Sequence, residues 1–520
     1  MWVKRKMIGI GVLVLIVAPL WWVTGNVRAE TSRAAVDAAP VQPSTLAQVD
    51  PGAQADSGID ALLRARITEL GLTGDPAAGR DVPSVDDEIV QLGKLLFFTK
   101  ALGGDKDSAC ASCHLPTLGG GDGISLPIGV GALDPDVLGP ERMHPSGGPT
   151  VPRNAPTTFN VALLDNFMFH DGRVESLTKA PGANGAGEAG IRTPDSKYGT
   201  ADPNAGLNLA MAQSRFPTTS NEEMRGFLYA LETDNDYLRN RLAARLGNYG
   251  HGFGELDGTG WAPLFTAVFG PAPDVESLIT EQRIAFAIGE YERSQLFVDN
   301  AWAAYVQGDE TALSDAAKRG ALLFHTSVAE GGAGCVTCHV GDKFTDEQFH
   351  VLAVPQIGPG KGDGVTRTDD FGRFRETRQL RDLYAFRTPS LLNVTELAPY
   401  GHDGVYVTLE GMVRHHLNPS AAVANFDWSQ LDPYIQLEHA PANSAKAVAR
   451  LEYNRSRGLS SIENVDLNDE QVDDLLAFLA ALTDPCVTDA ACLAPWMPSL
   501  SDPDPDGLRL DARLVADDVP

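Results

Sequence analysis

The stretch SACASCHLPTLGG (residues 108–120) decides how this chain is interpreted, because the chain nearly repeats it as GAGCVTCHVGDKF (residues 332–344). The two C-x-x-C-H units consist of Cys110, Cys113, His114, Cys335, Cys338 and His339. Zinc needs four ligands and each unit offers three, while a redox dithiol leaves the histidine unexplained. A c-type haem uses all three residues, two thiols on the porphyrin and the histidine on the iron. The sequence therefore predicts two covalently bound c-type haems.

The sequence around the two units is also repeated. Residues 91–114 and 318–339 each run Gly-x-Leu-Leu-Phe, then a glycine-rich turn, then C-x-x-C-H. Further along, residues 152–177 parallel residues 385–411, and each stretch contains His-Asp-Gly. A repeat of this length is a duplicated domain and not the unit of a solenoid. We therefore expect two related haem domains.

The expected fold class is all-α with long loops. The 52 glycines and 34 prolines indicate many turns, and no convincing run of alternating strand pattern is present. Ser314 is expected to cap the opening helix of the second domain. Apolar residues at helical spacing predict helices over residues 59–70, 88–102, 220–246, 276–296, 408–417 and 468–484.

The chain divides by composition into five parts. We expect a signal peptide or N-terminal anchor over 1–29, a linker over 30–80, haem domains over 81–305 and 306–485, and a disulfide loop and acidic tail over 486–520. Export into an oxidising compartment, the periplasm, favours a disulfide between Cys486 and Cys492. Free or intermolecular thiols are the alternative for that pair. The acidic stretch from residue 501 is expected to be a solvated tail.

Charge excludes some partners. The formal net charge is −28 and the pI about 4.7, so a nucleic acid or an anionic lipid surface is not expected as a partner. A small basic redox protein fits this field better.

The chain resembles the bacterial di-haem cytochrome c peroxidases and the related di-haem enzyme that matures methylamine dehydrogenase. The resemblance covers about residues 85 to 495 and rests on CASCH, RNAPTTFN, HDGR, NEEM, CVTCH, FRTPSLLNV and APYGHDGV in the order of the family. It implies two cytochrome c-like domains. The N-terminal haem, on His114, would reduce hydrogen peroxide, and the C-terminal haem, on His339, would receive electrons from a small cytochrome c or cupredoxin. It also implies that the protein can form a homodimer.

The resemblance assigns further roles. Glu223 matches the acid–base glutamate of the family, which moves protons on bound peroxide; a capping carboxylate at a helix start is the alternative. Asn154, with the backbone carbonyls of Leu397 and Pro399, matches a calcium site between the domains. A turn-capping role before a proline is the alternative for Asn154.

Three positions depart from the family. His416 stands where the peroxidases have a methionine ligand, so it is expected to be the sixth ligand of the second haem, with His415 as the alternative. His170 replaces an inter-haem tryptophan, which removes a tryptophan relay there. On the distal side of the first haem, family spacing leads to Val130, which cannot bind iron. His144 as a displaceable ligand and an open site are the two alternatives.

The sequence thus predicts an exported di-haem peroxidase that uses hydrogen peroxide and a small redox protein. A di-haem oxidase acting on a protein or small organic substrate is the nearest rival. A non-catalytic electron carrier, with both irons closed by histidines, is the rival of another class.

Overall fold

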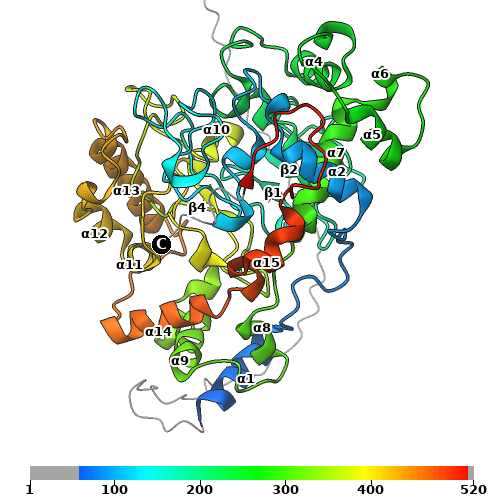
Figure 1. Ribbon diagram of the computed structural model, residues 1–520. Coiled ribbons are helices and arrows are strands. Elements are labelled where there is room, and N and C mark those ends of the chain that lie inside the picture. Colours follow the sequence, from blue (N-terminus) through cyan, green and yellow to red (C-terminus); the bar gives the residue numbers. More distant parts are fainter. Residues whose placement is uncertain (1–57, 513–520) are drawn as a thin grey trace, which may run out of the picture. The chain divides into compact units, whose positions relative to one another are not determined.

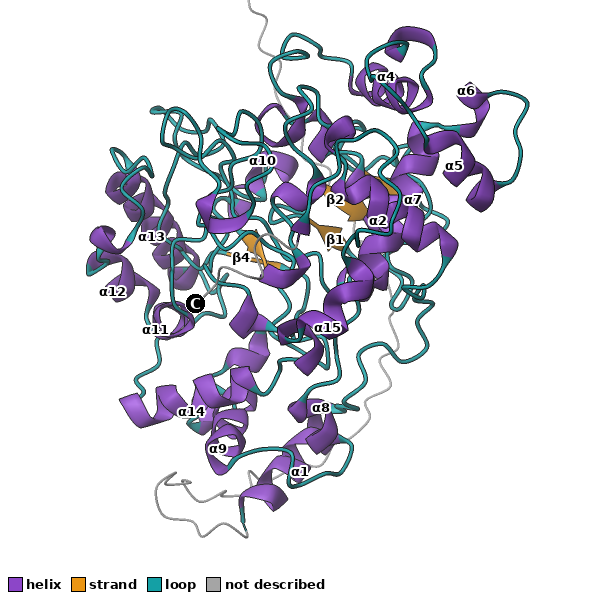
Figure 2. Ribbon diagram, viewed as in Figure 1, coloured by secondary structure: helices purple, strands orange, loops and turns teal. Residues whose placement is uncertain are grey.

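The computed structural model describes residues 58–512. The expected signal or anchor (1–29) and most of the expected linker lie outside the described residues. Within 58–512, no helix has the length and apolarity needed to cross a membrane. Helices joined by long loops make up most of this part of the chain (Figure 2).

The expected predominance of helix is confirmed for residues 58–512, with small strands added (Figure 1). The α-helices are α1 (Ile59–Leu70), α2 (Glu88–Phe98), α3 (Leu209–Ser214), α4 (Asn235–Gly247), α5 (Trp261–Phe269), α6 (Val275–Leu278), α7 (Glu281–Ser294), α8 (Ala301–Val306), α9 (Asp315–His325), α10 (Phe374–Thr377), α11 (Leu409–Leu417), α12 (Pro419–Ala424), α13 (Ala440–Ser456), α14 (Asp469–Ala480) and α15 (Ala490–Leu493). The strands are β1 (Phe167–Met168), β2 (Val174–Ser176), β3 (Ile191–Arg192), β4 (Phe349–His350) and β5 (Phe386–Arg387).

The strands form two small antiparallel sheets, in the orders β1-β2-β3 and β4-β5. In the second sheet Phe349 pairs with Arg387 and His350 with Phe386. Strands of two or three residues carry too little alternating pattern to be found from sequence. The expectation of a purely α-helical protein is corrected to this extent.

The first half is built on the crossing of α2 and α7, which lie side by side (Figure 1). The backbones approach so closely at Gly93 that a Cβ atom there would lie 1.9 Å from the carbonyl oxygen of Ala287. Around this crossing lies a large apolar core that includes Leu96, Phe97 and Tyr291.

The second half is built in the same way on α9 and α14 (Figure 1). A Cβ atom at Gly320 would lie 1.8 Å from the carbonyl oxygen of Asp474. Phe324 and Phe478 belong to the core around this crossing. Ser314 caps α9 by accepting a hydrogen bond from Ala317 N at 3.2 Å, as predicted.

Equivalent residues of the two halves contact the same carbonyl group. The side-chain amides of Asn160 and Asn393 both donate to the oxygen of Phe297, at 3.1 and 3.0 Å. Both asparagines have left-handed backbone angles, with φ of 62° and 63°. The segment that follows α7 is thereby held by equivalent residues of both halves.

Two predicted helices are interrupted in the structure, and those predicted over 88–102 and 468–484 end earlier, at Phe98 and Ala480. Residues 220–246 form a π-turn over Asn221–Arg225 and then turns, and only α4 is regular helix. Asp105 accepts hydrogen bonds from the backbone N–H groups of Phe227 and Leu228, which holds the chain out of a helix. The predicted helix over 276–296 is divided into α6 and α7 at Ile279 and Thr280.

The ends of the described chain pack on the cores. Leu63 and Ile67 of α1 are buried in the second core, and α1 matches the helix predicted over 59–70. Leu510 and Ala512 are fully buried in the first core. The expectation of a solvated tail is therefore wrong for residues 501–512.

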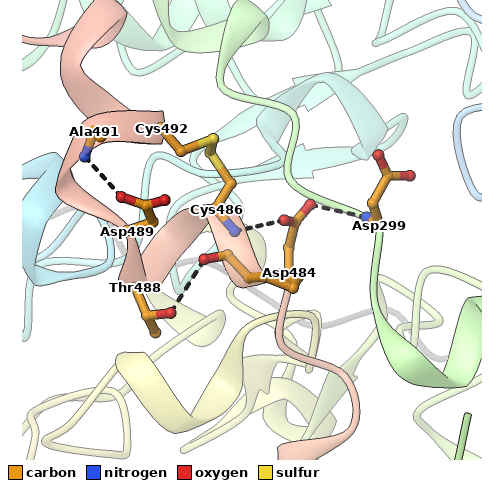
Figure 3. The surroundings of a disulfide bond; sticks show 8 residues. Asp299, Asp484, Cys486, Thr488, Asp489, Ala491 and Cys492 are labelled. Carbon is orange, nitrogen blue, oxygen red and sulfur yellow. Dashed lines mark hydrogen bonds between the residues drawn. A yellow bond between two sulfur atoms is a disulfide. The ribbon is translucent and has the colours of Figure 1, made fainter.

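A disulfide joins Cys486 and Cys492, as predicted. Figure 3 shows the surrounding contacts: the carboxylate of Asp484 accepts hydrogen bonds from the backbone N–H groups of Cys486 and Asp299. These contacts fix the start of the C-terminal segment to the linker between α7 and α8.

Candidate functional site

The second C-x-x-C-H unit forms a single 3-10 turn, Cys335–Thr337, that presents its histidine to a cavity. His339 Nδ1 lies 2.9 Å from the carbonyl oxygen of Phe344. A carbonyl only accepts, so Nδ1 carries the proton and Nε2 is free to bind a metal. Neither Cys335 nor Cys338 forms a disulfide, and burial raises the pKa of the Cys335 thiol to about 12.

His416 of α11 faces His339 across that cavity. The ring centroids are 6.3 Å apart, and His416 Nδ1 donates to the carbonyl oxygen of Met412 at 2.8 Å. Its Nε2 is therefore also free. Two imidazoles that bind one transition metal, with metal–nitrogen bonds of about 2 Å, have centroids roughly 6 Å apart. This pair fits the two axial ligands of a haem iron.

His415 has a different environment. It is fully buried, its Nδ1 is 2.7 Å from the hydroxyl of Tyr406, and its Nε2 is 2.9 Å from the carbonyl oxygen of Leu352. Both ring nitrogens are engaged, so His415 holds α11 in place. The geometry brings His416, and not His415, to His339.

The cavity around these histidines has a volume of about 450 Å³, within the range of roughly 300–1,000 Å³ that cofactor sites occupy. Its wall is largely apolar and includes Phe324, Leu352, Val354, Met412 and Leu479. An apolar wall with two thiols and one histidine suits a c-type haem, and the opposed histidine offers a second ligand to its iron.

The first C-x-x-C-H unit repeats the local geometry of the second. Cys110–Ser112 form a 3-10 turn, neither Cys110 nor Cys113 is in a disulfide, and His114 Nδ1 lies 3.0 Å from the carbonyl oxygen of Gly120. The aromatic ring beside His114 is Phe97, with centroids 6.5 Å apart. Within residues 58–512, no imidazole faces His114 as His416 faces His339.

Glu223 lies near this unit. It sits on the π-turn Asn221–Arg225, whose Glu222 carbonyl accepts a hydrogen bond from Val130 N at 3.3 Å. The negative charge of Glu223 contributes to the raised pKa values of Cys110 and Cys113, after the larger effect of their burial. Ser220, at the start of the turn, makes no capping hydrogen bond through its side chain, so the capping alternative finds no support.

Burial raises the pKa of Glu223, and the positive charges of Arg173 and Lys361 oppose part of that rise. Arg173 Nη2 lies 3.9 Å from Glu223 Oε1. A carboxyl group with a raised pKa exchanges protons closer to neutral pH than an exposed one, as a general acid–base requires. Sequence reasoning missed Lys361, because it comes from a loop of the second half.

His144 lies against Gly131, next to Val130. Its Nδ1 is 2.7 Å from Ser146 Oγ and 3.2 Å from Ser146 N. A backbone N–H only donates, so Nδ1 accepts and the proton resides on Nε2. A protonated Nε2 is the reverse of the arrangement in His114, His339 and His416. The geometry favours the open-site alternative.

The residues expected at the calcium site lie along the same cavity. Asn154 Nδ2 donates to the carbonyl oxygen of Pro399 at 2.7 Å, and Asn154 N donates to His402 O at 3.0 Å. The side chain of Asn154 is thus brought to Pro399, and Leu397 lines the cavity two residues earlier.

The remaining histidines near the cavity take structural contacts. His170 Nε2 lies 3.1 Å from the carbonyl oxygen of Asn154, His402 stacks on Phe386 at 3.7 Å between centroids, and His350 Nε2 lies 2.8 Å from Asp346 Oδ2. His350 and Asp346 also lie close to the sulfur of Cys338. That cluster shares a thiol needed for haem attachment, so we assign it no metal of its own.

Comparisons with known proteins find similarity to di-haem enzymes. The family model described as di-haem cytochrome c peroxidase matches residues 87–311. The chain is 29% identical to the methylamine utilization protein MauG of Methylorubrum extorquens over 357 residues, 69% of this chain and 75% of the relative. It is 28% identical to the cytochrome-c peroxidase IdrP1 of Denitromonas iodatirespirans, covering 67% and 77%.

Two further matches are similar in extent. The chain is 25% identical to the cytochrome c551 peroxidase of Pseudomonas aeruginosa, covering 69% of this chain and 77% of the relative. Among solved structures, the diheme peroxidase BthA of Burkholderia thailandensis aligns with a TM-score of 0.50 at 21% identity, covering 84% of this chain and 93% of BthA. The BthA match concerns the fold alone.

Proposed function

We infer that this chain, which belongs to the di-haem cytochrome c peroxidase family, reduces hydrogen peroxide to water with electrons from a small redox protein. It is an oxidoreductase whose family carries two c-type haems. The observation that carries the proposal is a difference between two like units: His416 faces His339, whereas Glu223 lies near the unit of His114.

The residues divide into two sites. When bound, each haem supplies an iron that exchanges single electrons, and an iron with an open face also binds peroxide. His114, with Cys110 and Cys113, would hold the first haem. His339 and His416 would close both faces of the second, whose thioethers come from Cys335 and Cys338. The second site then receives electrons and the first receives the oxidant.

Glu223 manages protons at the first site. Reduction of hydrogen peroxide to two waters consumes two electrons and two protons. Glu223 takes the proton from the oxygen that binds and returns it to the oxygen that leaves, so that the O–O bond breaks without a free hydroxide. Arg173 and Lys361 hold the carboxyl group in position by charge, and His144 stays beside the site as a polar neighbour and not a ligand.

The domain structure fits a duplication of one cytochrome c-like unit. Gly93 and Gly320 make equivalent close approaches, and Asn160 and Asn393 make equivalent contacts with one carbonyl. We assign 81–305 and 306–485 to the two copies, with 486–520 as an appendage whose described part, up to residue 512, packs on the first. The signal over 1–29 would direct the chain to the periplasm.

A calcium ion between the halves is the second part of the proposal. Asn154 and the carbonyls of Leu397 and Pro399 offer the oxygen ligands that this hard cation prefers. The contact of Asn154 with Pro399 supports it. Metal analysis of the purified protein should find about one calcium per chain, which Asn154→Ala removes while both haems stay; a calcium-free wild-type protein would refute this part. Light scattering decides whether the protein is a homodimer.

Electron paramagnetic resonance of the resting ferric protein tests the main proposal. We expect one low-spin iron, between two histidines, and one high-spin iron, and we expect peroxide to change the optical spectrum of the haems. Two low-spin irons that ignore peroxide would instead identify an electron carrier. Steady-state turnover with a reduced cytochrome c or cupredoxin then measures the peroxidase activity.

One observation favours a second candidate function, the oxidation of an organic or protein substrate. The residues just after Glu223 include three exposed apolar side chains, Phe227, Leu228 and Leu231, at 74%, 64% and 96% exposure. Phe227 lies against Gly131, beside His144. An apolar rim of this kind suits an organic or protein substrate, so an oxidase is the alternative. Peroxide-dependent oxidation of an apolar aromatic substrate, with little turnover of a redox protein, would select it.

A further inference from the structure

A column of aromatic rings runs from the second haem-binding unit toward the surface. Trp302 of α8 stacks on Tyr305 at 5.9 Å and 17°, and on His325 at 5.2 Å and 20°. His325 contacts Phe324 at 4.9 Å, and Phe324 lies 6.4 Å from His339. Between the expected haem ligand and Tyr305, no step separates ring centroids by more than 6.4 Å.

The outer end of this aromatic column has a base for the phenolic proton. Tyr305 is buried, and its hydroxyl donates to Asp60 Oδ1 at 2.7 Å. Asp60 also pairs with Lys318 Nζ at 2.8 Å, and its side chain is 24% exposed. The hydrogen bond from Lys318 lowers the pKa of Asp60, so the carboxylate is ionised and accepts. Burial raises the pKa of Tyr305, so the phenol keeps its proton until it is oxidised.

Packing alone does not account for the choice of residues. Trp302 Nε1 and both ring nitrogens of His325 are buried without a hydrogen-bond partner within residues 58–512. Buried tryptophans usually find such a partner, and an orphaned polar group costs stability. The first half has Phe98 at the position equivalent to His325, after the shared Gly-x-Leu-Leu-Phe run. An apolar ring suffices there.

We propose that Tyr305 and Trp302 form a one-electron relay to the second haem site, with Asp60 as its base. Tryptophan and tyrosine are the side chains whose rings lose an electron most readily. Phe324 and His325 connect them to His339 by contact and are not themselves oxidised. The relay rests on the proposed peroxidase function, because hydrogen peroxide supplies the oxidising equivalents that it carries outward.

The step balances in electrons and protons. One electron leaves Tyr305 through Trp302 and reduces one of the two oxidising equivalents that a molecule of peroxide leaves in the protein. The phenolic O–H bond breaks and Asp60 gains the proton as a carboxylic acid. A one-electron reductant outside the protein then restores Tyr305, and Asp60 returns its proton. The charged surface around Asp60 is thus a second entry for electrons, besides the rim of the cavity between His339 and His416.

Freeze-quench electron paramagnetic resonance tests the relay. The haem-loaded protein is mixed with hydrogen peroxide in the absence of a donor, with tyrosine ring-deuterated in a parallel sample. We expect an organic radical whose hyperfine pattern narrows on tyrosine deuteration. Tyr305→Phe should abolish this tyrosyl signal, and Trp302→Phe should abolish it although Tyr305 remains. Asp60→Asn should reduce its yield at least several-fold.

Matched variants control for the loss of any buried aromatic ring. Tyr384 is also buried and donates to an aspartate, Asp369, at 3.3 Å, so Tyr384→Phe should leave the signal unchanged. Trp261 is buried in the first core, and Trp261→Phe is the control for Trp302. Tyr305→Phe and Asp60→Asn keep every ring of the aromatic column. They therefore test the relay even if Trp302→Phe fails to fold.

The outcomes separate the relay from the function on which it rests. If the haem spectrum responds to peroxide but the radical is absent, or persists unchanged in Tyr305→Phe, the relay is wrong and the peroxidase proposal stands. If peroxide does not change the haem spectrum of the wild-type protein, the proposed function is wrong, and so is the relay that rests on it. A tyrosyl signal that requires both Tyr305 and Trp302 supports both.

Discussion

The two C-x-x-C-H units fold alike, yet the space across from each histidine is filled differently. In both, a 3-10 turn presents a histidine whose Nδ1 donates to a nearby backbone carbonyl. Across from His339 stands His416, brought there by α11. The neighbourhood of His114 instead contains Glu223 on its π-turn. The local sequence of each C-x-x-C-H unit determines how the haem would be attached. Segments distant in sequence determine which side chain lies on the other side of the histidine.

This comparison predicts the largest effect for Glu223. Glu223→Gln removes the proton carrier and keeps the shape, so turnover with peroxide should fall about 10²–10⁴-fold while both haem spectra persist. Glu222→Gln, one residue away, changes a carboxylate that accepts a hydrogen bond from Ser220; it is the control and should retain nearly full turnover. Stopped-flow measurement of peroxide consumption decides. Equal losses in both variants would mean that the turn, and not Glu223, matters.

Replacement of His416 should change the midpoint potential of the second haem and leave the chemistry of peroxide reduction unchanged. His416→Met replaces one nitrogen ligand by a thioether, which favours ferrous iron, so the midpoint potential of one haem should rise. Potentiometric titration measures it. His415→Asn should lower thermal stability, since His415 joins Tyr406 to Leu352, with both potentials unchanged. If the midpoint potential shifted in His415→Asn but not in His416→Met, His415 would be the ligand and His416 the structural residue.

Substitutions at the two helix crossings test whether the halves are packed equivalently. Alanine at Gly93 or Gly320 places Cβ within 2 Å of a facing carbonyl oxygen, so each variant should lose about 3 kcal/mol or more of unfolding free energy. Gly258→Ala, where no atom lies within 4 Å of the added Cβ, is the control. Chemical denaturation measures all three. If one crossing tolerates alanine, the halves are not packed equivalently.

Sequence predicted the features that local residues determine. The cap at Ser314, the helix over 408–417 and the Cys486–Cys492 disulfide follow from short patterns, and the structure confirms them. Of the helix predicted over 468–484, α14 covers Asp469–Ala480. The π-turn that carries Glu223 was not foreseen, because Asp105, far away in sequence, holds its exit. The motifs predicted which types of residue belong to the two haem sites, but not how these residues lie relative to one another.

Two further cases show what signal was present. Leu508, Leu510 and Ala512 alternate with charged residues, the pattern of a half-buried extended segment, and Leu510 N donates to Phe98 O at 2.9 Å. That alternation could have identified a packed segment where acidic composition indicated a tail. For His415 and His416, neighbours on one helix, no local pattern decides which faces the cavity. The positions of Tyr406 and of the Leu352 carbonyl decide it, because both bind the ring of His415.

The pH dependence offers a finer test of the first site. Glu223 must be ionised to take a proton, and burial raises its pKa, so activity should fall on the acid side as pH drops through that raised value. Arg173 favours the ionised form. Arg173→Gln should therefore raise the pKa further and move the acid limb to higher pH, whereas Arg173→Lys should leave it nearly in place. An acid limb that ignores both variants would assign the limb to another group.

The smallest expected effect tests which half meets the donor. Glu463 is an exposed residue that lines the cavity of His339 and His416, whereas Glu188 is an exposed residue of the first half. With a cationic cytochrome as donor, Glu463→Lys should slow reduction about two- to fivefold at low salt. Glu188→Lys alters net charge equally and should change the rate little.

The salt dependence separates steering from structural damage in these two variants. Exposed charges are screened over about 10 Å at 0.1 M salt, so the wild-type rate should fall as salt rises, and the difference caused by Glu463→Lys should disappear. Equal slowing by both variants would mean that the overall charge of −28 attracts the donor without selecting a half. A deficit in Glu463→Lys that persists at high salt would mean that the cavity rim itself was disturbed. Only a salt-sensitive deficit confined to Glu463 places electron entry at the site closed by two histidines.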